Sequence, residues 1–124
     1  MADHPPKTVI SKALIQRVAA TIAHHFSPQK IILFGSHAQG EASPESDLDL
    51  LVIMETELPF HKRAVPIRLL FQSAPCPLDI LVHTPEETAY WNGVTNHIIT
   101  RAMATGKVLH AESGNQVAGP ESFT

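Results

Sequence analysis

At 124 residues and a formal net charge of −3, the chain has the size of one folded domain, and its acidic balance argues against strong nucleic-acid binding through phosphate contacts. Its single cysteine excludes an internal disulfide and fits a reducing cytosol, and no run of about 18 apolar residues could span a membrane. We therefore expect a cytoplasmic protein with no membrane segment.

Composition divides the chain into a central folded region and two polar ends. Residues 1–7 contain two prolines, and we expect a flexible N-terminus there. Residues 111–124 are polar and rich in glycine, which predicts a disordered tail. The intervening residues, 8–110, are expected to form one domain.

The first half of this domain alternates helix and strand. From residue 8 to residue 26 apolar side chains recur at every fourth position, which predicts an amphipathic helix. The short apolar run of residues 30–34 predicts a buried strand, and residues 47–54 (DLDLLVIM) predict a second one. Between the two strands, residues 36–40 can form a single helical turn.

The second half continues the alternation of helices and strands. Residues 56–73 have a mostly helical pattern, which Pro66 divides or kinks. The remaining predicted elements are a strand over residues 77–83, helices over 84–92 and 96–106, and a short strand or extended arm over 107–110. This order predicts an α/β (α+β) domain, with a small mixed β-sheet and helices packed on it.

Two acidic side chains lie at the start of the second predicted strand. Asp47 and Asp49 are two positions apart, so in a strand they point to the same face, where their like charges repel. At the mouth of a buried strand this repulsion is costly unless a cation lies between them. Mg²⁺ is usually held by one or two carboxylates together with water and phosphate, so the pair predicts a Mg²⁺ site.

A third acid, Asp79, opens the next predicted strand in the sequence PLDILV. If that strand pairs with the second one, Asp79 can reach the same metal or act as a base, because adjacent strands lie about 5 Å apart. Three carboxylates from two strands suit a site with two Mg²⁺ ions that supports in-line displacement at phosphorus.

A glycine and a serine follow the first predicted strand directly. Gly35 allows the backbone to bend sharply and a ligand to approach closely, and Ser36 begins the helical turn. Free backbone N–H groups at such a start bind phosphate. The glycine–serine turn and the acids together predict a site that holds a nucleoside triphosphate and its metal.

These residues resemble a known motif. The segments GSHAQG and SDLDLLV are similar to the GS-x-A-x-G…SD-x-DL-x-V motif of the minimal nucleotidyltransferases (MNT), a branch of the DNA polymerase β-like superfamily. The likeness runs from about Lys30 to Val82 and includes the later acidic strand. It implies the nucleotidyltransferase fold, with ATP as a substrate and Mg²⁺ as the metal.

The resemblance also implies a role for each residue that matches the motif. Gly35 and Ser36 correspond to the positions that hold the triphosphate, and Asp47 and Asp49 correspond to metal ligands. Asp79 corresponds to the third carboxylate, which shares a second ion and deprotonates the acceptor hydroxyl. All three aspartates are thereby expected to be catalytic.

A partner protein follows from the same resemblance. Proteins of this branch often accompany a helical HEPN ribonuclease toxin and act as its antitoxin. They transfer AMP from ATP to a tyrosine hydroxyl near the active site of the toxin. The resemblance therefore implies a HEPN-type toxin as the partner and protein adenylylation as the reaction.

The sequence departs from the family pattern at Gln39, where arginine is frequent. Glutamine can still hydrogen-bond a phosphate, so Gln39 is a predicted nucleotide contact, but it brings no charge. Two outcomes are open: nucleotide binding is weaker, or Lys62, Arg63 or Arg68 supplies the charge instead. His37 lies inside the same turn and is a further candidate for contact with the nucleotide.

Gln39 also leaves alternative functions open. The chain could be a binding module that keeps the nucleotidyltransferase fold and neutralises its partner by contact, without turnover. Transfer to a small molecule such as an antibiotic is a third reading, which needs an acceptor cleft that a homodimer could supply. The stretch AYWNGVTNHII, residues 89–99, could form a partner surface or pack in the core.

Overall fold

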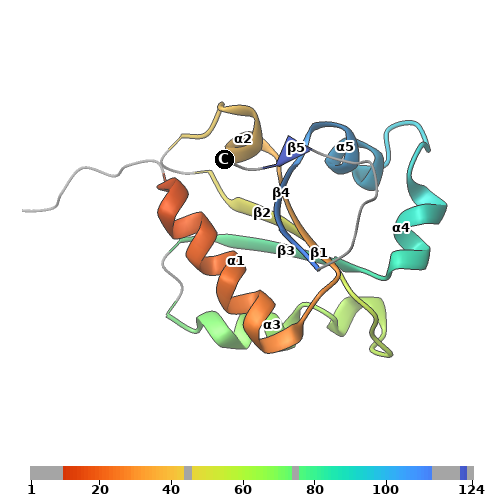
Figure 1. Ribbon diagram of the computed structural model, residues 1–124, viewed down its shortest axis with the longest axis horizontal. Helices are drawn as coiled ribbons and strands as arrows, with labels where there is room; N and C mark the ends of the chain where they lie inside the picture. Colours follow the sequence, from red (N-terminus) through yellow and green to blue (C-terminus); the bar gives the residue numbers. More distant parts are fainter. Residues whose placement is uncertain (1–9, 44–45, 74–75, 113–120, 123–124) are drawn as a thin grey trace, which may run out of the picture.

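The computed structural model describes residues 10–43, 46–73, 76–112 and 121–122. Within this part of the chain, five strands form one mixed sheet that is covered by helices on both faces (Figure 1). The strands are β1 (Lys30–Phe34), β2 (Leu48–Ile53), β3 (Leu78–His83), β4 (Lys107–Ala111) and β5 (Glu121–Ser122). Their order across the sheet is β3-β2-β1-β4-β5, which confirms the predicted small mixed sheet.

Five α-helices and two short 3₁₀ turns accompany the sheet in the described residues. They are α1 (Lys12–Phe26), α2 (Ser36–Gln39), η1 (Phe60–Lys62), α3 (Val65–Arg68), η2 (Leu69–Phe71), α4 (Pro85–Trp91) and α5 (Ile98–Thr105). None of these helices is long and apolar enough to cross a membrane.

Capping residues mark both ends of helix α1. The Ser11 side chain accepts a hydrogen bond from the backbone N–H of Leu14 at 3.1 Å, which satisfies one of the free donors of the first turn. At the other end Ser27 adopts the left-handed conformation, with φ of 46°, and stops the helix. The predicted spacing of four buries Val18 and Ile22 against the sheet.

The strands are buried on both faces because helices lie on both sides (Figure 1). On one side Leu48, Leu50 and Val52 pack with α1 and α3, and on the other Leu51 and Ile53 pack with α5. Alternate residues of β2 therefore enter different cores. This explains why the strand is continuously apolar after its two acids.

Strand pairing places the ends of β1, β2 and β3 at one edge of the sheet. Strand β1 runs antiparallel to β2, with Phe34 opposite Asp49, and β2 runs parallel to β3, with Asp49 beside Asp79. The predicted pairing of the second and third strands is thus present. It brings the acids of two strands and the turn after β1 to the same place.

Residues 56–73 are divided into short helical pieces, as the predicted helical pattern interrupted at Pro66 indicated. The segment forms η1, α3 and η2 in succession, and Pro66 lies in the first turn of α3, where its missing N–H costs no hydrogen bond. Phe60, Val65 and Leu69 are about half exposed, so the apolar residues of this segment do not form one buried helical face.

The two predicted ends lie mostly outside the described residues, so the domain limits 8–110 remain a prediction. Within the tail expected over residues 111–124, however, Ala111 ends β4, and Glu121–Ser122 pair in parallel with Lys107 and Val108. The open edge of β4 offers backbone N–H and C=O groups that pair with an extended segment whatever its side chains. A polar composition therefore did not exclude strand pairing here.

The stretch AYWNGVTNHII contributes both to the core and to the surface. Ile99 is fully buried, and the Trp91 ring stacks on the His97 ring with centroids 4.5 Å apart. Tyr90, by contrast, is 73% exposed. The core interpretation therefore holds for Ile99 and Trp91, whereas Tyr90 is open to a partner.

Candidate functional site

The turn after β1 is built around Gly35, whose φ of 76° and ψ of −156° lie in a region that is essentially restricted to glycine. Its carbonyl oxygen accepts hydrogen bonds from Ala38 N at 3.1 Å and Gln39 N at 3.3 Å, and these bonds start α2. A Cβ atom on residue 35 would overlap Asp49 Oδ2. Because glycine has no side chain, the predicted phosphate turn can lie directly against a predicted acid.

The three predicted acids come from the start of two neighbouring strands. Asp47 is exposed and immediately precedes β2, whereas Asp49 is half-buried within it. Asp79 lies beside Asp49 in the parallel pairing of β2 with β3, and its side chain is 64% exposed. One carboxylate is thus partly withdrawn from water between two that solvent reaches freely.

The electrostatics of Asp49 show that these acids act on one another. Partial burial, followed by the like charges of Asp79 and Asp47, raises the pKa of Asp49 from 3.8 to about 6, and nearby His37 opposes the shift. His37 itself lies 3.3 Å from the Ser46 carbonyl oxygen through Nε2. Charge on Asp49 is therefore disfavoured in the metal-free fold, and a cation would relieve that cost.

Asp79 has a cationic neighbour in Arg68, one of the three candidates for the missing charge. Arg68 Nη1 donates to the Leu78 carbonyl oxygen at 3.1 Å, and Nη2 lies 3.9 Å from Asp79 Oδ1. Both side chains are at least half exposed, so this ion pair is weak. Arg68 therefore lies at the acids, without holding Asp79 tightly.

The three carboxylates are of the ligand type that a hard divalent metal ion prefers. In the part of the chain that the structure describes, no three His, Cys, Asp or Glu side chains are close enough together to form a metal site as they lie. Asp47, Asp49 and Asp79 nevertheless supply the hard oxygen ligands that Mg²⁺ prefers. Partial burial and the like charges of Asp79 and Asp47 raise the pKa of Asp49, and a bound cation would offset this cost.

A hollow of about 190 Å³ lies where the end of β1, α2 and α5 meet. Its lining residues come from these three elements: Phe34, Gly35, Gln39, Ile98, Arg101, Ala102 and Thr105. The predicted nucleotide contacts Gly35 and Gln39 thus border a cavity. Among the described residues that line it, Arg101 alone carries a charge.

Sequence reasoning missed Arg101, although the sequence contained a signal for it. Ile98, Arg101, Ala102 and Thr105 follow the spacing of one helical face. That spacing places Arg101 on the side of α5 that carries Ala102. The sequence alone did not show that this side borders the turn after β1.

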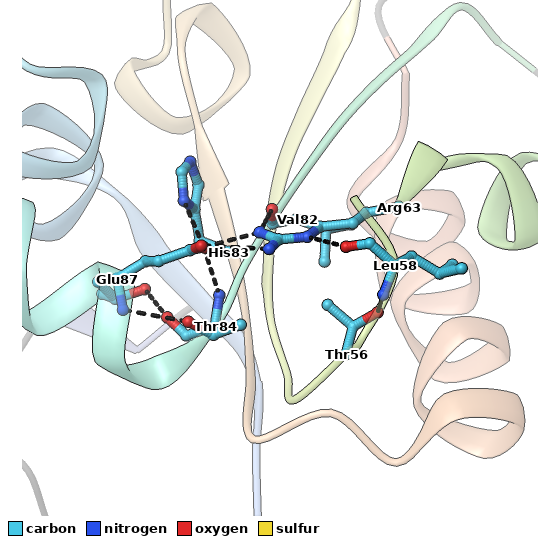
Figure 2. Close-up of polar contacts among 8 residues, drawn as sticks. Thr56, Leu58, Arg63, Val82, His83, Thr84 and Glu87 are labelled. Atoms are coloured by element: carbon cyan, nitrogen blue, oxygen red, sulfur yellow. Dashed lines mark hydrogen bonds and ion pairs between the residues drawn. The ribbon is translucent and has the colours of Figure 1, made fainter. Parts of the chain in front are cut away.

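Arg63, another candidate for the missing charge, lies elsewhere and has a structural role (Figure 2). Its Nη1 and Nη2 donate to the Glu87 carboxylate at 2.7 and 3.1 Å, and its Nε donates to the Leu58 carbonyl oxygen at 3.0 Å. Glu87 also accepts from the Thr84 backbone N–H and contacts His83, the last residue of β3. Arg63 is therefore at the opposite end of β3 from Asp79, about 13 Å along the strand.

The contacts of Glu87 stabilise its charged form. Hydrogen bonds from Arg63 and then from the Thr84 backbone lower the pKa of Glu87 from 4.5 to about 2. Lys62 ends the η1 turn directly before Arg63, so neither residue lies at the predicted triphosphate site. The possibility that either residue replaces the motif arginine is therefore not supported, because Arg63 is engaged by Glu87 at the other end of β3.

We predict that Glu87→Gln destabilises the fold without a direct effect on the acidic site. The change leaves the largely buried Arg63 guanidinium without its carboxylate, and we expect a loss of about 1–3 kcal/mol in the free energy of unfolding at pH 7. Because the folded pKa of Glu87 is lowered, this contribution is present above pH 4.5 and fades as the pH falls towards 2. Urea unfolding of both proteins across that range measures it; equal stabilities at pH 7 would contradict the assignment.

Comparison with known proteins agrees with this geometry. The nucleotidyltransferase domain family matches residues 15–102, which is more than half of the chain and includes Gly35 and all three acids. A protein of Sulfolobus solfataricus provisionally assigned as a nucleotidyltransferase has 21% identity and a TM-score of 0.51, over 63% of this chain and 70% of that one. A toxin–antitoxin structure with AMP-PNP has 20% identity and a TM-score of 0.56, over 79% and 74% respectively. At these identities the two structures show a shared fold, and no curated protein sequence gave a significant match.

Proposed function

Because this chain belongs to the nucleotidyltransferase domain family, we propose that it transfers AMP from ATP to a hydroxyl group of a partner protein, with Mg²⁺ as cofactor. The partner that we propose is a toxin of the HEPN type, with tyrosine as the acceptor, so that the chain acts as an antitoxin. The resemblance of the GSHAQG and SDLDLLV segments to the MNT motif supports this choice. The fold shared with a toxin–antitoxin structure that contains AMP-PNP supports it as well.

The observation that carries the proposal is the environment of Asp49. Within the described residues, its carboxylate makes no hydrogen bond, has acidic neighbours in Asp47 and Asp79, and occupies the space that a side chain at residue 35 would need. Partial burial beside like charges is unfavourable for a carboxylate that serves only the fold. Two bound ligands would together account for a carboxylate in this position: a divalent cation between the acids, and a phosphate chain along the glycine turn.

Each of the three acids can have a separate role in the reaction. Asp47 and Asp49 would bind Mg²⁺, with Asp79 as the third carboxylate, and a bound ion would offset charge on the phosphates and on the departing pyrophosphate. Asp79 accepts the proton of the acceptor hydroxyl as the new bond from that oxygen to the α-phosphorus forms. The bond from the α-phosphorus to pyrophosphate breaks, and pyrophosphate leaves. The high exposure of Asp79 gives a hydroxyl on a second protein access to it.

A second candidate function is contact inhibition without turnover. Gln39 lacks a charge, and the acids are not already arranged as a metal cage in the described residues. Both features would be expected of a nucleotidyltransferase fold that binds its toxin and no longer reacts. The apolar side chains of Phe60, Val65 and Leu69 are exposed and available for such contact.

Transfer of label separates the two candidates. The chain is incubated with the protein encoded by its neighbouring gene, MgCl₂ and ATP that carries ³²P at the α-phosphate. We expect label on the partner, and none when EDTA replaces MgCl₂, since the reaction needs the cation. A complex that forms and suppresses the partner's ribonuclease activity without any label would contradict the enzymatic proposal and support contact inhibition.

A further inference from the structure

We propose that Arg101 binds the terminal phosphates of the nucleotide, in the hollow bordered by Gly35 and Gln39. This inference rests on the proposed function and adds to it the residue that supplies the cationic contact. Arg101 and its helix α5 lie outside the glycine–serine turn and the acidic strands in the sequence. In the fold, however, Arg101 lines the same hollow as Gly35 and Gln39.

The guanidinium of Arg101 is available for a ligand. The residue is exposed, and within the described part of the chain only its backbone groups take part in hydrogen bonds, to His97 and Thr105. The side chain of Arg63, in contrast, is engaged by Glu87, and that of Arg68 by Leu78 and Asp79. Arg101 is therefore a cation that borders a cavity and has no partner for its charge among the described residues.

The backbone that carries Arg101 is held firmly against the sheet. On the same helix Ile99 and Ala102 are almost completely buried against β1. Gly106, which ends the helix, approaches so closely that a Cβ there would overlap the Ala102 carbonyl oxygen and the Ile32 side chain. This packing fixes the distance between α5 and the turn after β1, so the position of Arg101 does not depend on a flexible loop.

The size and charge of the hollow indicate which part of a nucleotide it holds. At about 190 Å³ it is smaller than the roughly 300–1,000 Å³ of a site that encloses a whole ligand of nucleotide size. The acids lie in β2 and β3, on one side of β1, whereas α5 packs over the sheet at β1 and leads into β4, the strand on the other side of β1. A triphosphate with its α-phosphorus at the acids would cross Gly35 and direct its terminal phosphates towards Arg101.

Guanidinium–phosphate contacts are charge-assisted and often bidentate. We therefore expect Arg101→Gln to weaken the binding of Mg²⁺-ATP and of inorganic tripolyphosphate by about 10- to 100-fold, and that of AMP by about twofold or less. Arg101→Lys should lie between the two. Arg17→Gln is the matched control, because Arg17 is exposed on α1 and the hollow is bordered by α5. Isothermal titration calorimetry measures the affinities, and thermal melting verifies that each variant is folded.

Each outcome of this titration decides one point. Wild-type affinity for ATP in Arg101→Gln would overturn the inference and leave the proposed function intact. An equal loss for ATP and AMP would also overturn it, because Arg101 would then contact the nucleoside or the α-phosphate. Failure of the wild-type protein to bind Mg²⁺-ATP at all would instead overturn the proposed function.

A second variant tests whether the charge acts within this hollow. Gln39 lies on the facing wall, so Gln39→Arg places a guanidinium on the same cavity from α2. Combined with Arg101→Gln, it should recover at least about tenfold in ATP affinity. A folded double variant that binds ATP no better than Arg101→Gln would contradict the assignment of this cavity to the phosphates.

Discussion

Replacing Asp49 with Asn should lower AMP transfer by at least about a thousandfold, because the variant loses a proposed metal ligand and with it about 4 kcal/mol of transition-state stabilisation. The same change should stabilise the metal-free protein at pH 7, since the partly buried charge and its repulsion with Asp47 and Asp79 disappear. A residue required only for folding would show the opposite effect on stability. Opposite signs for activity and stability therefore identify Asp49 as a functional residue.

The pH dependence of this gain follows from the direction of the pKa shift. The folded pKa of Asp49 is about 6 and the ordinary value is 3.8, so the folded state retains its proton over that interval while the unfolded state loses it. The contribution of Asp49 to stability therefore becomes unfavourable as the pH rises from about 4 to 6, and it is constant above that. The shift sets an upper limit of about 3 kcal/mol, and partial solvation of this half-buried group reduces the expected gain to about 1–2 kcal/mol.

Urea unfolding of wild-type and Asp49→Asn protein at pH 4 and pH 7, with and without MgCl₂, measures both effects. Mg²⁺ should stabilise the wild-type protein at pH 7 and have little effect on the variant. Glu57→Gln is the matched control, since it removes an exposed carboxylate beyond the opposite end of β2. If Asp49→Asn is less stable than wild type at pH 7 in the absence of MgCl₂, or transfers AMP at the wild-type rate, the assignment is contradicted.

Gly35→Ala should remove both stability and function. The backbone at residue 35 lies in a region that alanine adopts only with strain, and the added methyl group would overlap the Asp49 carboxylate. We expect a loss of about 3 kcal/mol or more in the free energy of unfolding, together with loss of Mg²⁺-ATP binding. Thermal melting and calorimetry measure these two effects.

The control for this change is Gly40→Ala. Gly40 has a similar positive φ of 73°, but nothing lies within 4 Å of the position that its Cβ would take. Gly40→Ala therefore includes the cost of a left-handed backbone, about 1 kcal/mol, but no collision like that with Asp49. Equal destabilisation by the two substitutions would show that contact between Gly35 and Asp49 is not what the turn depends on.

Much of the acidic site could be predicted from the sequence because its geometry is local. Alternation along a strand predicted Asp47 and Asp49 on one face; in the structure Asp47 lies just before β2, and its charge acts on Asp49. The apolar residues that follow indicated a buried strand. The pairing that sets Asp79 beside Asp49 required only that two consecutive strands be adjacent and parallel. The roles of these residues in binding a metal and a nucleotide remain predictions.

The errors arose where tertiary contacts decide the structure. The sequence indicated a helical segment divided near Pro66 but not that it forms three short pieces, in which Phe60 and Leu69 stay exposed. Arg63 is close to β2 in sequence, yet its ion pair with Glu87 belongs to the far end of the sheet. Arg101 was overlooked because the crossing of α5 over β1 is not visible in either segment alone.

The most direct test of the account is a crystal structure of the protein with Mn²⁺, as a stand-in for Mg²⁺, and a non-hydrolysable ATP analogue. We expect anomalous density for manganese within coordination distance of Asp47 and Asp49, with the α-phosphate beside it and the phosphate chain along Gly35. A well-ordered analogue bound elsewhere, or manganese that does not contact these carboxylates, would contradict the central claim that the acids and the glycine turn form one metal–nucleotide site.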